Sequence, residues 1–230
     1  IRRPPRSTQG VSSAASDVYK RQVLDKETLL IGLSERNSKA SIEAILPLFF
    51  GEGFTRVLLI DLPKTRSMMH LDTLFSSISA TDIIVYPPLF NDQEINGHTV
   101  QTYCLESGQS LFDVTPLAQS LADCLRDQGY DFNAINCGGN EPLNQEREQW
   151  SDGANAFTLA PGKIINYARN KETTAALQQA GYHQVDAADF INNATDHMAD
   201  DQQLVITIAS AELPRGRGGP RCLTMPLDRA

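Results

Sequence analysis

The chain has 230 residues, a formal net charge of −8 and 41% hydrophobic residues. This length fits one ordinary domain or two small ones, and the apolar fraction is sufficient for a packed core, so the composition excludes a wholly disordered protein. The acidic balance argues against nucleic acid and anionic membrane surfaces as partners, because both are bound by positive fields. No apolar run approaches the roughly 18 residues of a membrane-spanning helix, so we expect a soluble protein.

The cysteines are few and scattered along the chain, at Cys104, Cys124, Cys137 and Cys222. No two of them form a CxxC pair, so a structural zinc site has no support. They are also too few for a disulfide scaffold, which indicates a reducing compartment and a cytoplasmic location.

The charge is unevenly distributed. Residues 1–22 carry a net charge of +4, whereas the remaining 208 residues carry −12. The first segment is rich in Arg, Ser and Pro, has no apolar periodicity, and the first methionine of the chain is Met68. A mitochondrial transit peptide and a basic disordered tail are alternatives, but the string resembles translated sequencing-adaptor sequence. We therefore expect a non-native leader at 1–22 and the C-terminal part of a larger catalytic domain at 23–230.

Apolar runs separated by turn signals predict an α/β fold. Ser38 is the expected N-cap of a helix that ends near Gly51, and Pro161-Gly162 indicates a hairpin. We expect strands within 23–33 (two), and at 55–60, 71–78, 82–86, 98–105, 132–136, 156–159, 164–167, 183–186 and 204–208. We expect helices at 38–50, 116–128 and 172–179, and a polar insertion loop with helical turns at 189–201.

One pattern occurs twice. A hairpin, an Arg-Asn pair, a helix and a strand follow one another around Arg36-Asn37 and again around Arg169-Asn170. Such self-similar units suggest repetition about an axis, in which each unit buries its apolar face against its neighbours. The alternative is a plain two-layer α/β domain in which the similarity is a coincidence.

The segment from Arg66 to Asp72 is the first candidate for chemistry. His70 and Asp72 are two residues apart, so on an extended strand both side chains would point into the same space. A histidine beside a carboxylate is a candidate general acid or base. The alternative is a polar edge strand with a surface histidine.

The second candidate is Cys222, which follows a loop rich in glycine and arginine. Guanidinium groups at Arg215, Arg217 and Arg221 favour the thiolate, which is the nucleophilic form of cysteine. The glycine amides could hold an anionic group such as a carboxylate. The alternatives are a small buried hydrophobic cysteine and an arginine–glycine segment of the kind that binds nucleic acid.

Two charged loops complete the candidates. Arg36 could bind a substrate carboxylate with its planar fork, or it could be an ordinary charge near a helix start. The loop that holds Gly138, Gly139 and Asn140, followed by a charged stretch with Trp150, could be the rim of an active site or a solvated turn with one anchoring aromatic.

Taken together, these sequence segments resemble those of arginine deiminase. The resemblance runs from about residue 23 to the end of the chain. Its motifs are GLSERNS (32–38), LPKTRSMMHLDTLF (62–75), GGN with EREQWSDG (138–153), PGK with YARN (161–170) and ELPRGRGGPRCLTMPL (212–227).

The resemblance implies the fold of the guanidino-group-modifying enzymes, a five-bladed α/β propeller (pentein) of ββαβ units, with the N-terminal blades missing here and roughly three present. It also implies hydrolysis of arginine to citrulline and ammonia without a metal or organic cofactor. Carried over, Cys222 is the nucleophile, His70 the general acid/base and Asp72 a carboxylate that holds the guanidinium. The implied substrate-binding residues are Arg36 and Arg217, for the α-carboxylate, and Asn140.

The implied reaction passes through a covalent amidino-cysteine intermediate, and the full-length protein is expected to be a homo-oligomer with arginine as its small-molecule partner. Two further carboxylates of the family, one of them in a Glu-Gly-Gly-Asp motif, have no counterpart apart from Asp17, which stands near one of them by accident. We therefore expect this chain by itself to be nearly inactive. The alternatives are a related guanidino hydrolase or amidinotransferase, and a non-catalytic fragment or pseudoenzyme.

Overall fold

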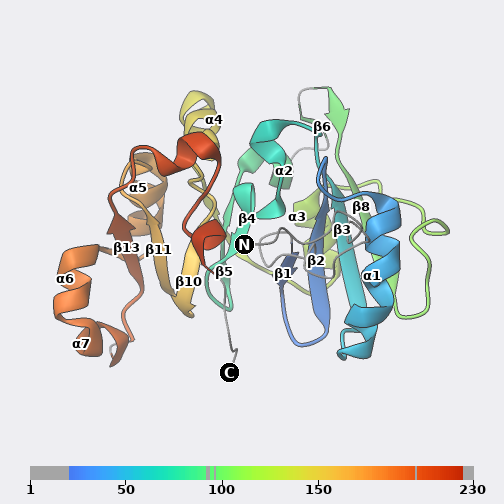
Figure 1. Ribbon diagram of the computed structural model, residues 1–230, viewed down its shortest axis with the longest axis horizontal. Coiled ribbons are helices and arrows are strands. Elements are labelled where there is room, and N and C mark those ends of the chain that lie inside the picture. The colour runs from blue at the N-terminus through green and yellow to red at the C-terminus, as the bar shows by residue number, and fades with distance from the viewer. Residues whose placement is uncertain (1–20, 92–93, 96, 200, 225–230) are drawn as a thin grey trace, which may run out of the picture.

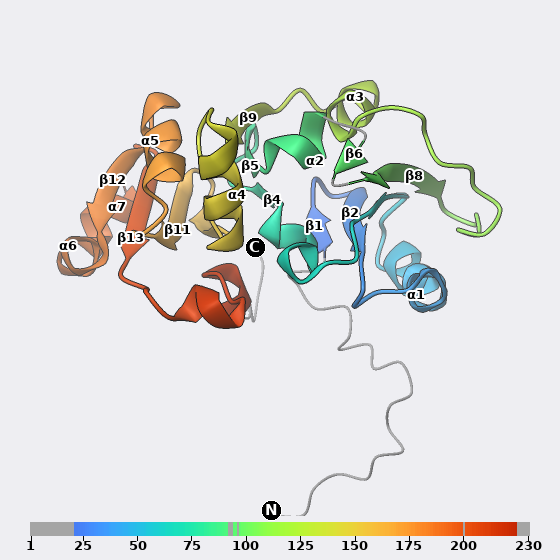
Figure 2. The ribbon, with the colours of Figure 1, turned by 90° about the horizontal axis from the view of Figure 1, so that it is seen from above.

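The computed structural model describes residues 21–91, 94–95, 97–199 and 201–224. Three mixed sheets follow one another around an arc, with helices packed beside them (Figure 1, Figure 2). Each sheet starts with an antiparallel hairpin, and the second hairpin strand pairs in parallel with a strand that follows in the chain after a helix. None of the described helices is long and apolar enough to cross a membrane.

The first sheet has the order β1-β2-β3-β8, in which β3 and β8 are antiparallel. Helix α1 connects β2 to β3 and begins after Ser38, whose hydroxyl oxygen accepts from the Ser41 amide in a reciprocal capping box. All six residues of β2 are buried, because α1 covers one face of the sheet and the second unit covers the other. The bounds are β1 Arg21–Val23, β2 Thr28–Leu33, α1 Lys39–Gly51, β3 Arg56–Asp61 and β8 Gln101–Glu106.

The second sheet has the order β4-β5-β9. Strand β5 is buried along its whole length, as expected for a central strand with both faces covered. Its bounds and those of the surrounding elements are β4 Phe75–Ser77, β5 Asp82–Val85, α2 Pro87–Asn91, β6 Glu94–Ile95, β7 His98–Thr99, α3 Leu121–Asp127 and β9 Asn133–Asn136.

The third sheet has the order β10-β11-β13-β12. The β10–β11 turn contains Gly162 at φ 77°, a conformation that glycine adopts without steric cost. The bounds are α4 Pro142–Trp150, β10 Phe157–Ala160, β11 Lys163–Tyr167, α5 Lys171–Gln179, β12 His183–Asp186, α6 Ala187–Asn192, α7 Ala194–Ala199 and β13 Leu204–Ile208.

The predicted repetition of hairpin–helix–strand units is present, and it occurs three times rather than twice. In the third unit the strand next to β11 is β13, not β12, because β12, α6 and α7 form an excursion that leaves β12 at the sheet edge. The predicted insertion loop at 189–201 is largely helical, in α6 and α7.

Two sequence expectations are corrected. Only 75–77 of the strand expected at 71–78 is a strand, because Leu71–Thr73 forms a 3₁₀ turn in which every residue is buried. The helix expected from residue 116 begins at Leu121, because Leu117 bridges to Thr102 and Ser120 caps the helix. Gln22, the last residue of the expected leader, lies in β1, is buried, and donates to the Phe75 carbonyl at 3.3 Å.

Polar contacts join the neighbouring units. The Tyr130 hydroxyl donates to Asp25 Oδ2 at 2.5 Å, between the second and first units. Tyr182 Oη and Gln203 Nε2 each donate to Asp82 Oδ2 at 3.0 Å, between the third and second units. These contacts link the first unit to the second and the second to the third.

Candidate active site around Cys222

The segments that carry the candidate residues are short turns rather than strands. One pair of turns, η4 (Arg66–Met68) and η5 (Leu71–Thr73), lies between β3 and β4. The other pair, η6 (Leu213–Gly216) and η7 (Arg221–Leu223), follows β13. Figure 2 shows this last segment running from the third sheet back toward the middle of the arc.

Cys222 and Asp72 meet at the centre of the site, although 150 residues separate them in the chain. The Cys222 thiol lies 3.7 Å from Asp72 Oδ2. Asp72 is fully buried, and its Oδ1 accepts no hydrogen bond from the residues that the structure describes. Burial raises the pKa of Asp72 to about 7, while the positive charge of Arg221 opposes the rise. The site therefore offers an incompletely satisfied carboxylate, which is suited to bind a cation.

The buried side chain of Asn155 contacts the loop that carries Cys222 at two points. Its Nδ2 donates to Cys222 Sγ at 3.4 Å, and its Oδ1 accepts from the Arg221 amide at 2.9 Å. Gly219 packs against the same side chain so closely that an added Cβ would lie 2.2 Å from Oδ1.

The arginines do not activate the thiol as the sequence suggested. Burial raises the pKa of Cys222 to about 12, and the negative charge of Asp72 raises it further. The expected lowering of the Cys222 pKa by three nearby guanidinium groups is therefore wrong. Arg215 is exposed and pairs with Glu212, so its charge acts in solvent.

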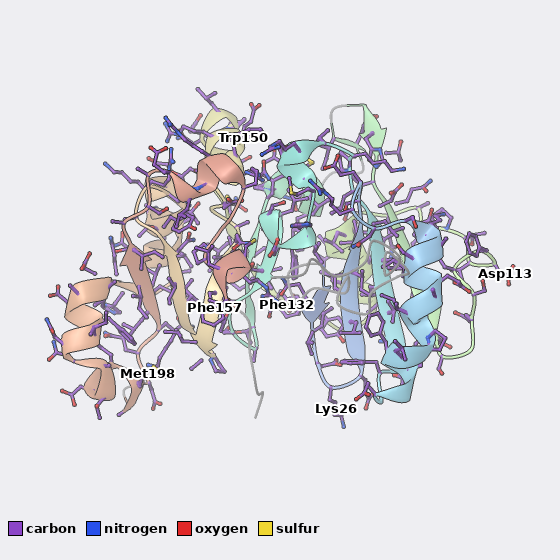
Figure 3. The ribbon with its side chains drawn as sticks, viewed as in Figure 1. Lys26, Asp113, Phe132, Trp150, Phe157 and Met198 are labelled. Atoms are coloured by element: carbon purple, nitrogen blue, oxygen red, sulfur yellow. The ribbon has the colours of Figure 1, made fainter. Side chains whose placement is uncertain are left out.

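The side chain of Arg217 is buried among other groups of the protein. Its side chain is 1% exposed, and its guanidinium lies 3.5 Å from Asp152 Oδ1. It donates to the carbonyl oxygens of Ser67 and Gln149, at 2.5 and 3.4 Å, and to that of Trp150, and it stacks 5.1 Å from the Trp150 ring centroid. Trp150 is labelled in Figure 3 at the end of α4. In this structure Arg217 joins the loop before Cys222 to two other segments.

His70 is the residue before η5, and its backbone is extended at φ −137° and ψ 150°. Its carbonyl oxygen accepts from the Thr73 amide and hydroxyl, which closes the 3₁₀ turn. The expected strand that would place His70 and Asp72 on one face is therefore wrong. The turn is anchored by the buried Gln149, whose Nε2 donates to the carbonyls of Ser67 and Thr73 at 2.7 and 3.2 Å.

The other two predicted residues lie apart from Cys222. Arg36 is exposed and pairs with its neighbour Glu35, with a distance of 3.3 Å from Nε to Oε1. Asn140 is exposed, and its Oδ1 accepts from Asn136 Nδ2 at 3.3 Å. The structure thus brings Cys222 and Asp72 together, places His70 at the start of the same turn as Asp72, and gives Arg36 and Asn140 only local partners among the contacts it describes.

Three buried polar residues of the site were not singled out from the sequence. They are Gln149, Asp152 and Asn155, and all belong to α4 or the turn after it. The signal is the dense polar stretch around Trp150, for which the sequence suggested an active-site rim or a solvated turn rather than buried support. Asp152 has φ 62°, and burial raises its pKa to about 6 despite Arg217. Among the described residues, no three His, Cys, Asp or Glu side chains are grouped as a metal site would require.

Comparison with known proteins gives the family. The family model described as arginine deiminase matches residues 17–229. Arginine deiminase of Listeria monocytogenes serotype 4a (strain HCC23) is 37% identical over 213 residues, which cover 90% of this chain and 45% of that protein. Arginine deiminase of Mycoplasma capricolum subsp. capricolum is 36% identical over 216 residues, with the same shares covered.

Solved structures give a weaker likeness. An amidinotransferase of Microseira wollei, SxtG, has a TM-score of 0.49 at 12% identity, over 89% of this chain and 45% of that chain. These values are too low to support an inference about activity. The profile match over nearly the whole chain shows that the protein belongs to the arginine deiminase family.

Proposed function

We propose that this chain carries the catalytic cysteine of an enzyme that hydrolyses L-arginine to L-citrulline and ammonia. The observation that supports it is the Cys222 thiol, 3.7 Å from the buried Asp72 carboxylate, in a chain of this family. A buried carboxylate with an unused oxygen binds a guanidinium, and a thiol beside it can reach the guanidinium carbon.

The proposed reaction has two steps. In the first, the Cys222 sulfur forms a bond to the guanidinium carbon, the bond from that carbon to one terminal nitrogen breaks, and His70 supplies the proton with which ammonia leaves. In the second, His70 takes a proton from water, the water oxygen bonds to the amidino carbon, and the carbon–sulfur bond breaks. Citrulline is released, and Cys222 is regenerated.

The substrate itself helps to form the thiolate. Burial and the charge of Asp72 raise the pKa of Cys222 to about 12, so its thiol is protonated at neutral pH. A guanidinium cation placed between Asp72 and Cys222 favours both anions and lowers both pKa values. The thiol proton passes to His70, which then supplies it to the departing ammonia, so Asp72 remains the anion that holds the guanidinium. The nucleophile is thus formed only when the substrate is in place.

We propose that the complete reaction requires a protein longer than this chain. The chain spans about 45% of the length of the curated relatives described above. We propose that two upstream carboxylates, implied by the family resemblance, complete the guanidinium site, because one buried carboxylate holds a delocalised cation poorly. The guanidinium of Arg36 is exposed, and we propose that it binds the carboxylate of the substrate in the longer protein.

The test uses the protein completed with its upstream sequence. We expect equal amounts of citrulline and ammonia from arginine, and citrulline at background in Cys222→Ala. The 230-residue chain alone is expected to release no citrulline above background. Turnover that survives Cys222→Ala in the completed protein would contradict the assignment of the nucleophile, and ornithine in place of citrulline would indicate transfer or cleavage at the other carbon–nitrogen bond.

A further inference from the structure

We propose that the side-chain amide of Asn155 is the hydrogen-bond donor that positions Cys222 and stabilises its thiolate, and that Gly219 leaves the space this amide occupies. The inference deepens the proposed function and rests on it, because it takes Cys222 as the reacting group. It gives Asn155 a positioning role.

The contacts fix which end of the amide faces the sulfur. The Arg221 backbone N–H can only donate, so the atom that lies 2.9 Å from it is the amide oxygen of Asn155. The other end, Nδ2, therefore points its N–H toward Cys222 Sγ, 3.4 Å away. Asn155 is fully buried, so water does not compete for either contact.

Gly219 keeps the amide in this position. A Cβ at Gly219 would lie 2.2, 2.3 and 2.5 Å from Oδ1, Cγ and Cβ of Asn155, distances that no relaxed packing permits. Among the described residues, no heavy atom lies within 4 Å of the corresponding position at the adjacent Gly218. A methyl group added at Gly219 would therefore displace Asn155, whereas one added at Gly218 would not.

A neutral donor suits this site for a chemical reason. The sulfur has Asp72 on one side, which disfavours the thiolate, and the Asn155 N–H on another, which favours it. The Asn155 side chain also lowers the pKa of Asp72 by hydrogen bonding, so it favours the anionic form of both groups. A lysine or arginine at this place would do the same but would repel the cationic guanidinium of the substrate. An amide stabilises the anions without that repulsion.

The test measures the rate of Cys222 alkylation by iodoacetamide across neutral and alkaline pH, in the 230-residue chain. Trypsin cleaves after Arg221, so Cys222 begins its own peptide and its labelling is read by mass spectrometry. In Asn155→Ala we expect the apparent pKa of Cys222 to rise by about one unit, which lowers the alkylation rate about tenfold at a given pH. Asn155→Asp is expected to raise it more, because it adds a negative charge. Gly219→Ala should reproduce the effect of Asn155→Ala, and Gly218→Ala should leave the profile unchanged.

Cys104 serves as an internal control, because it is half-buried and its labelling should not change. A merely structural role for Asn155 predicts looser packing, and hence faster labelling of Cys222 with no shift in the pH profile. Faster labelling without a shift of the profile would overturn the proposal. So would an Asn155→Ala variant that has an intact fold by circular dichroism and the same pH profile as the unsubstituted chain.

A measurement on the unsubstituted chain covers the case in which these variants do not fold. Capping Cys222 with methyl methanethiosulfonate should shift the side-chain amide resonance of Asn155 in a ¹⁵N NMR spectrum, and an unmoved resonance would refute the contact. Neither readout needs arginine, so a failure of this inference is distinguishable from a failure of the proposed reaction, which citrulline release decides.

Discussion

The first and third units share a plan but are stabilised differently. Each places an Arg-Asn pair before its helix, at Arg36-Asn37 and Arg169-Asn170. In the first unit the contacts are local: Asn37 donates to the Gly32 carbonyl, and Ser38 caps its own helix. In the third unit Asn170 binds Ser151 through both amide atoms, and the cap of α5 comes from another helix.

Two ion pairs of these regions differ in their exposure to solvent. The ion pair between Arg36 and Glu35 lies in solvent, whereas that between Arg217 and Asp152 is 1% exposed on both sides. Buried, long-range polar contacts thus accumulate around the turn after α4, which is also the turn that supports Cys222. We infer that the site is built by cross-links between segments, whereas the Arg-Asn pair and the helix start of the first unit are held by local contacts.

The largest expected effect separates the two arginines. Arg217→Met leaves the Asp152 carboxylate buried without a counter-charge, which should lower the free energy of unfolding by about 3–4 kcal/mol. Arg36→Met removes an exposed pair and should cost less than about 1 kcal/mol. Urea denaturation of both variants measures this, and equal losses would remove the contrast between the buried and exposed pairs.

The helix caps give the next effect. Glu148 accepts from the amides of Glu172 and Thr173 and from the Thr173 hydroxyl, at 2.8–3.0 Å. Glu148→Ala leaves these buried donors unsatisfied and should cost about 2–3 kcal/mol, against about 1 kcal/mol for Ser38→Ala at the start of α1. Urea denaturation compares the two variants. A larger loss of unfolding free energy in Ser38→Ala than in Glu148→Ala would contradict the argument that the cap supplied by another helix contributes more.

The buried carboxylates predict a pH dependence. Their folded-state pKa values, about 7 for Asp72 and about 6 for Asp152, lie above the ordinary value of 3.8. The folded chain therefore holds protons that the unfolded chain releases, so these groups make the protein less stable as the pH rises from about 4 to 7. Asp72→Asn removes one such group and should stabilise the fold by about 2 kcal/mol at alkaline pH, a gain that shrinks as the pH falls.

Thermal unfolding over a pH series measures that gain. The exposed Asp123, whose pKa is lowered by hydrogen bonds from Ser120 and Arg126, supplies the matched control. Asp123→Asn should leave the loss of stability between pH 4 and 7 in place. A gain from Asp72→Asn that does not vary with pH would show that the carboxylate is not the cause.

The smallest expected difference concerns the two asparagines themselves. Asn170→Ala breaks contacts with Ser151 at 2.6 and 3.2 Å, and we expect a cost of about 2 kcal/mol. Asn37→Ala breaks the 3.1 Å bond to Gly32 and should cost about 1 kcal/mol. Because Ser151 lies in the turn that supports Cys222, we expect Asn170→Ala to change the labelling of Cys222 as well. If hydrogen exchange increases in α5 alone and Cys222 labelling is unchanged, the third unit does not stabilise the site through Asn170.

The local pattern of the sequence was sufficient for most elements. The strand at 204–208, the helix that Ser38 caps and the hairpin at Pro161-Gly162 were predicted because periodicity, caps and turn residues act over a few neighbouring positions. The turn at Leu71–Thr73 was missed for the converse reason: every residue from 71 to 76 is buried, so no alternation distinguishes a strand from a tight turn.

The site shows the same division. The sequence by itself determined the residue types, and the resemblance selected Cys222, His70 and Asp72. Only the tertiary structure decided that Asp72 and Cys222 meet across 150 residues, that Arg217 is buried against Asp152, and that Asn155 binds the sulfur. Burial also reversed the expected direction of the pKa shift at Cys222, because desolvation and a neighbouring carboxylate outweigh charges that the sequence can count but cannot place.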